Sequence, residues 1–148
     1  MSEVATQTMD VDGTPELCFQ VVADVESYPG WTGDIKAVTV RSRDGDGRPT
    51  EVEFRAAAFG RSTTYELAYD YSRSPKVLAW RLVKGDLTSK LDGSYTFDSR
   101  EDGGTELTYV LDIELKVPLP GFVKRRAQSR IMHAALSELK ARVESIGN

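Results

Sequence analysis

The sequence is poor in the residues that build metal centres and disulfides. It contains one cysteine, Cys18, and one histidine, His133. A single cysteine excludes an internal disulfide, and the two residues together are too few for a Cys/His zinc site. A Ser-His-Asp triad could be built only around His133. We therefore expect neither a cofactor nor a metal site of the usual kinds.

Long hydrophobic runs are also missing. No apolar stretch approaches the roughly 18–20 residues that a membrane span needs. Residues 1–13 carry acids where a signal peptide has a basic start and an apolar stretch. With 148 residues, 40% of them hydrophobic and 28% charged, the composition is that of an ordinary globular protein. We expect residues 1–148 to form a single cytoplasmic domain.

Charge is unevenly distributed along the chain. Residues 1–74 carry 7 Lys+Arg and 13 Asp+Glu, a net of −6, whereas residues 75–148 carry 12 and 10, a net of +2. The mildly acidic whole argues against DNA binding, which favours a broad basic face. Within the second half, residues 117–137 contain four basic residues and no acid.

Hydrophobic periodicity predicts a clear order of elements. A first strand is predicted from Val4 to Val11, and Thr14-Pro15 predicts the capped start of a short helix. Residues 28–31 break that helix and can form a second helical turn. Six successive strands are predicted between Lys36 and Lys116, separated by turns that include a hairpin at 59–61. A long helix from Phe122 to about Ile146 follows.

Alternation gives every predicted strand one apolar and one polar face, so the antiparallel sheet should be covered on a single side. The final helix is the expected cover. Its predicted apolar stripe consists of Ala127, Ile131, Ala135, Leu139, Val143 and Ile146.

Four segments carry a family resemblance: TPELCFQVVADVESYPGW at 14–31, GSYTF at 93–97, DGGTELTYVLDIEL at 102–115 and VPLPGFVKRR at 117–126. Together with the order of elements, they resemble the START-like (helix-grip) superfamily, and within it the bacterial polyketide cyclase/dehydrase and lipid-transport group. The resemblance implies an α+β helix-grip fold. In that fold a strongly bent antiparallel sheet of about seven strands wraps around the C-terminal helix, and a short helical pair follows the first strand.

The same resemblance implies a cavity between the sheet and the last helix, because family members bind lipids, sterols, quinones or polyketides. Alanines on the facing surfaces permit either close packing or room for a ligand, and the residues alone leave both readings open. If a cavity forms, we expect its walls to be Phe54, Leu67, Tyr69, Trp80, Leu82, Tyr95, Tyr109, Leu111, Ile131 and Ala135.

Candidates for catalysis are few. Cys18 could be a nucleophile, but no histidine is near it in sequence, and a buried structural cysteine is the better interpretation. His133 falls opposite the apolar stripe and is interpreted as a surface residue. No pair of inward carboxylates and no nucleophile-base pair is evident. Tyrosines and Ser89 are the polar groups expected deep in the cavity.

Lys124, Arg125 and Arg126 stand at the start of the long helix, where the helix dipole disfavours cations. One interpretation is an anion site at the cavity mouth, for a lipid headgroup, a carboxylated ligand, an anionic membrane surface or RNA phosphates. The other is a solvated helix face. On the first interpretation, residues 118–121 and 59–61 would form the rim of the mouth.

Three functions remain open. The favoured one is non-enzymatic binding or transport of a hydrophobic small molecule, such as a lipid, a quinone or a polyketide-like compound. The alternatives are a polyketide aromatase/cyclase that acts by confining its substrate, and a protein- or ribosome-interaction module. The sequence does not define the oligomeric state.

Overall fold

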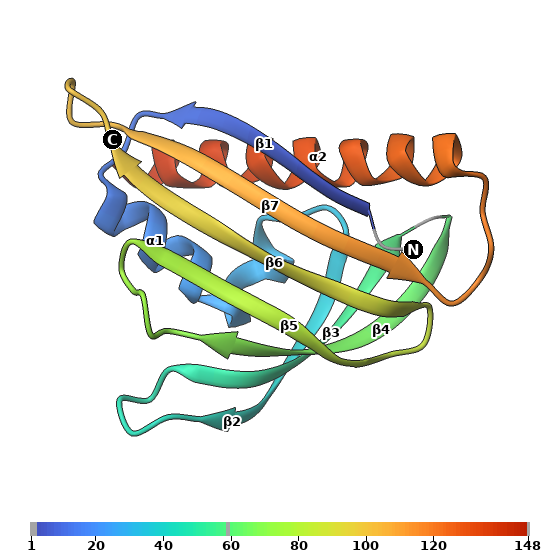
Figure 1. Cartoon of the computed structure of the whole chain (residues 1–148). Coiled ribbons are helices and arrows are strands. Elements are labelled where there is room, and N and C mark those ends of the chain that lie inside the picture. Colours follow the sequence, from blue (N-terminus) through green and yellow to red (C-terminus); the bar gives the residue numbers. More distant parts are fainter. Residues whose placement is uncertain (1–2, 59, 148) are drawn as a thin grey trace.

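A computed structural model describes residues 3–58 and 60–147. These residues form a curved sheet of seven antiparallel strands around a long C-terminal helix (Figure 1). The predicted α+β helix-grip arrangement is thereby confirmed. In chain order the elements are β1 (Glu3–Val11), α1 (Pro15–Ala23), η1 (Val25–Gly30), β2 (Ile35–Arg43), β3 (Pro49–Ala58), β4 (Arg61–Asp70), β5 (Val77–Gly85), β6 (Thr88–Ser99), β7 (Thr105–Leu115) and α2 (Gly121–Gly147).

The strand order is β1-β7-β6-β5-β4-β3-β2. Strands β2 to β7 are therefore neighbours in the order of the chain. Strand β1 pairs with β7 and forms one edge of the sheet, and β2 forms the other. Figure 1 shows α2 running alongside β1 and β7, with α1 and η1 within the curve of the sheet. This leaves one concave face to be covered by the three helices. Among the described helices, none is both long and apolar enough to cross a bilayer.

The short helical pair forms as the sequence predicts. Thr14 accepts a hydrogen bond from the Leu17 amide at 3.2 Å, which caps α1, and Pro15 occupies its first turn. Helix α1 buries Cys18, Val21 and Val22 against the sheet. The Tyr28 hydroxyl donates to the carbonyl of Val22 and so ties η1 to α1.

The face that α2 presents to the core differs from the predicted stripe. Leu139 and Val143 are buried as expected, but Ile146 is 46% exposed because it lies at the helix end. Over the first half of α2 the buried stripe is displaced by one residue and includes Gln128, whose amide donates to the Leu111 carbonyl at 3.0 Å. That hydrogen bond lets a polar residue occupy a core position. The buried residues of α2 are Gln128, Met132, Leu136, Leu139 and Val143.

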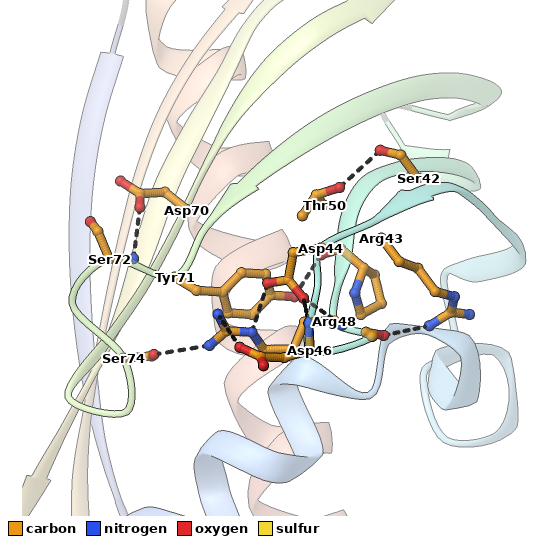
Figure 2. Close-up of polar contacts among 12 residues, drawn as sticks. Ser42, Arg43, Asp44, Asp46, Arg48, Thr50, Asp70, Tyr71, Ser72 and Ser74 are labelled. Carbon is orange, nitrogen blue, oxygen red and sulfur yellow. Dashed lines mark hydrogen bonds and ion pairs between the residues drawn. The ribbon is translucent and has the colours of Figure 1, made fainter.

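Polar contacts fix the turn between β2 and β3 against the end of β4 (Figure 2). The Arg48 guanidinium lies 4.5 Å from the centre of the Tyr71 ring and forms an ion pair with Asp44 at 2.8 Å. The Tyr71 hydroxyl donates to the Pro49 carbonyl at 2.7 Å. These contacts hold the β2–β3 turn against Tyr71, the residue that follows β4.

Candidate functional site

A cavity of about 170 Å³ lies between the concave face of the sheet and α2. The small residues on the facing surfaces therefore leave room, and the core between sheet and helix is not solid. Nine of the ten side chains predicted as walls line this cavity. They are Phe54, Leu67, Tyr69, Trp80, Tyr95, Tyr109, Leu111, Ile131 and Ala135.

Leu82 is the exception. Its side chain packs with the smaller apolar cluster that contains Val25 and Val52, and it is not part of the cavity lining. Strand β5 also separates from β6 before it reaches Leu82. Its paired residues with β6 run only from Val77 to Trp80, and the Leu82 amide then donates to the Asp92 carboxylate at 2.9 Å. Simple alternation along β5 does not anticipate this separation of the two strands.

Aromatic rings form a continuous wall of the cavity. The rings of Tyr95 and Tyr109 stack with centroids 4.5 Å apart, and the Trp80 ring lies 5.5 Å from Tyr95 and 5.9 Å from Tyr109. Trp80 has room because its partner on β6 is Gly93. A Cβ atom at Gly93 would lie 2.6 Å from the indole. The glycine inside a strand is thus explained by the close approach of the tryptophan ring.

Four tyrosine hydroxyls at the cavity form no hydrogen bond to any described residue. Tyr28 and Tyr71 donate to main-chain carbonyls, whereas the other tyrosines do not. Burial raises the pKa of each of these four hydroxyls well above its ordinary value, so all stay protonated near neutral pH. The cavity therefore holds four hydrogen-bond donors that lack a partner within residues 3–58 and 60–147: Tyr65, Tyr69, Tyr95 and Tyr109.

This difference between tyrosines predicts different costs for the same substitution. Tyr71→Phe should lower the free energy of unfolding by about 1 kcal/mol, because the Pro49 carbonyl loses its donor. Tyr69→Phe should change it by less than about 0.5 kcal/mol, because no protein partner is lost. Urea unfolding of both variants measures the two costs. Equal losses would contradict the assignment of an unpartnered hydroxyl to Tyr69.

Two residues of the lining, Asp34 and Ala57, are exposed, so the cavity opens to solvent near the end of the η1–β2 loop. Asp34 and Glu138 both belong to the lining, and Glu138 accepts a hydrogen bond from the Gly33 amide at 2.7 Å. Strand alternation indicates neither residue, because both lie outside the strands; Asp34 is exposed and Glu138 is half-buried. Their proximity depends on a contact between segments about a hundred residues apart, which local alternation does not reveal.

The basic residues predicted to form an anion site at the cavity mouth do not line the cavity. Lys124, Arg125 and Arg126 are not part of the lining, and neither are residues 118–121. Helix α2 contributes to the lining at Ile131, Ala135, Glu138 and Leu139 instead, one turn or more farther along. At the β3–β4 hairpin, Ala57 and Ala58 line the cavity, while Phe59 lies outside the described residues.

The remaining catalytic candidates are not arranged for chemistry. Cys18 is fully buried, and burial raises the pKa of its thiol, which disfavours the nucleophilic thiolate. His133 is exposed, and Ser89 is exposed outside the lining, where Thr88 takes the inward position. Over residues 3–58 and 60–147, no group of three or more His, Cys, Asp or Glu side chains could hold a metal ion.

Solved structures share this fold over nearly the whole chain. A START superfamily protein from Mycobacterium smegmatis is 26% identical, with a TM-score of 0.91 over 97% of this chain and 98% of that one. The Zhui aromatase/cyclase from Streptomyces sp. R1128 is 15% identical, with a TM-score of 0.87 over 100% and 97%. The major latex-like protein 151 of Panax ginseng is 11% identical, with a TM-score of 0.75 over 96% and 97%.

No curated protein matches the chain in sequence. The family model described as polyketide cyclase / dehydrase and lipid transport matches residues 3–144. That match includes all seven strands, the short helical pair and most of α2, and hence every part of the cavity wall. With the sequence, the fold and the cavity in agreement, the chain belongs to the polyketide cyclase / dehydrase and lipid transport family.

Proposed function

We propose that this protein binds a small hydrophobic molecule that contains an aromatic ring and at least one polar substituent. The observation that carries the proposal is the aromatic cavity with four tyrosine hydroxyls that have no hydrogen-bond partner among the described residues. Buried polar groups in proteins are normally hydrogen-bonded, so groups left without a partner favour a ligand or water at that place. An apolar concavity with a few polar groups is the usual form of a small-molecule site.

The size of the cavity limits what fits without rearrangement. A cavity of about 150 Å³ accommodates benzene, so about 170 Å³ suits a compact system of one or two rings. A longer acyl or polyketide chain would have to extend through the mouth, past Asp34 and Glu138. The aromatic walls favour a flat ligand, since rings gain from offset stacking and edge-to-face contacts.

A titration with 2-naphthol tests the proposal. Trp31 and Trp80 both line the cavity, so binding should change the intrinsic fluorescence of the protein in a saturable manner. We expect one site per chain, a negative heat-capacity change by calorimetry, and weaker binding of naphthalene, which has no hydroxyl. The absence of saturable binding to both compounds would contradict the proposal.

A second candidate function is polyketide aromatase/cyclase activity. The specific observation in its favour is that Asp34 and Glu138 belong to the lining, which places carboxylates beside the tyrosine donors. The structural likeness to the Zhui aromatase/cyclase is compatible with it. Asp34→Asn and Glu138→Gln discriminate the two functions. In a cyclase they should reduce turnover of a poly-β-keto substrate and spare its binding, and in a carrier no turnover is expected in the wild type.

A further inference from the structure

Exposed apolar side chains gather at the start of α2. Seven large hydrophobic residues are exposed among the described residues, and four of them fall within residues 117–123. The most exposed of the four is Phe122, at 61%. Exposed apolar residues that are scattered singly need no explanation, but a contiguous group marks an interaction surface. The group consists of Val117, Leu119, Phe122 and Val123.

Basic residues surround this apolar group. The stretch from residue 115 to residue 137 contains five basic residues and no acid. Arg125 and Arg126 stand three and four positions after Phe122, so they share its face of the helix. Arg126 and Arg130 are both exposed. The apolar-basic patch, as we name it, comprises the four apolar residues together with Lys116, Lys124, Arg125, Arg126 and Arg130.

The composition of the patch is unfavourable for the isolated fold. The first turns of a helix disfavour cations because of the helix dipole, and Phe122, at 61% exposed, buries less than half of its surface in the fold. Neither arrangement improves the stability of the isolated chain. Both become favourable against a surface that is negatively charged and offers an apolar layer beneath the charge.

We propose that the apolar-basic patch docks the protein on the surface of an anionic lipid bilayer. Phe122 and its apolar neighbours would enter the boundary between headgroups and acyl chains, and the basic residues would contact the anionic headgroups. Figure 1 shows that the connection from β7 and the first turn of α2 lie together at one end of the molecule. The inference goes beyond ligand binding, because no residue of the patch lines the cavity.

Other occupants fit the patch less well. Two copies of the chain meeting through it would bring ten basic side chains together, which electrostatic repulsion opposes. A single-stranded nucleic acid favours several aromatic rings that stack on bases, and Phe122 is the one aromatic side chain in the patch. An anionic bilayer satisfies both its apolar and its basic parts.

Sedimentation with lipid vesicles tests the proposal. The full chain should bind phosphatidylcholine vesicles that contain phosphatidylglycerol, bind vesicles of phosphatidylcholine alone at least tenfold more weakly, and lose affinity as salt is raised. Arg126→Gln combined with Arg130→Gln should reduce binding at least tenfold, at roughly fivefold for each lost charge. Phe122→Ser should reduce it by a similar factor.

Matched control variants lie at the other end of the same helix. Arg142→Gln and Ile146→Ser remove an exposed cation and an exposed apolar side chain there, and should leave vesicle binding unchanged. All variants should keep the wild-type circular dichroism and the wild-type affinity for 2-naphthol, which separates this proposal from the proposed function.

Three results would overturn the proposal. The first is binding that is absent, or equal for anionic and neutral vesicles. The second is an equal loss of vesicle binding in the patch and control variants. The third is that Phe122→Ser and the double arginine variant abolish instead the binding of a single-stranded RNA, or dissociate a dimer of the chain, while vesicles are not bound.

Discussion

Replacing Ala135 by tryptophan should abolish the binding of 2-naphthol while the protein remains folded. Ala135 lies in the cavity wall on α2, and its methyl group faces the space between helix and sheet. Because a cavity of about 150 Å³ accommodates benzene, the two-ring indole would occupy most of a volume of about 170 Å³. We expect affinity to fall by at least a hundredfold in the fluorescence titration.

The stability of this variant is as informative as its affinity. Overpacking a solid core costs about 1–3 kcal/mol, whereas filling an existing void should cost less than about 1 kcal/mol. Ala141→Trp provides the control, because Ala141 is an exposed residue of the same helix. It should change neither binding nor stability. A folded Ala135→Trp variant with wild-type affinity would contradict the assignment of the cavity as the binding site.

Substituting Gly93 by alanine should destabilise the fold by about 2 kcal/mol. A Cβ atom at this position would lie 2.5 Å from the Val110 carbonyl oxygen and 2.6 Å from the Trp80 indole. The Trp80 ring has to shift, and the main chain at Gly93 has to move away from the Val110 carbonyl, which strains the pairing of β6 with β7. We expect a lower midpoint in urea, a changed tryptophan emission spectrum and weaker binding of 2-naphthol.

Gly45→Ala is the matched control for this substitution. A Cβ atom at Gly45 would meet no atom within 4 Å, and the residue lies in the exposed β2–β3 turn. Alanine at such a site is neutral or stabilises by up to about 1 kcal/mol, because it restricts the unfolded chain. If Gly93→Ala were as harmless as Gly45→Ala, the close approach of Trp80 to β6 would not determine the shape of the cavity.

Much of the site is predictable because strand alternation is a local property. Every second residue of a strand faces the same side, so the inward positions of β3, β4, β5 and β7 follow once the strands are recognised. Phe54, Tyr69, Trp80 and Tyr109 were identified in this way. Leu82 also faces inward, where it packs with the cluster of Val52, Phe54 and Leu67, but it does not reach the cavity lining.

Features that depend on tertiary contacts were not predictable. The buried stripe of α2 includes Gln128, a polar residue that enters the core because the Leu111 carbonyl accepts its amide hydrogen. The carboxylates at the mouth depend on the contact between Gly33 and Glu138. Gly93 carried a signal in the sequence, since a glycine inside a strand often marks a close approach. That signal does not say which side chain approaches.

The central claim is that the cavity between the sheet and α2 holds a small aromatic ligand. Nuclear Overhauser effects between bound 2-naphthol and protein methyl groups test it most directly. The account predicts contacts from the ligand protons to the methyl groups of Ala135 and Ile131 on α2 and of Leu111 on β7, which face the cavity from opposite sides. Contacts confined to the exposed Val117, Leu119 and Val123, with none to these three residues, would contradict it.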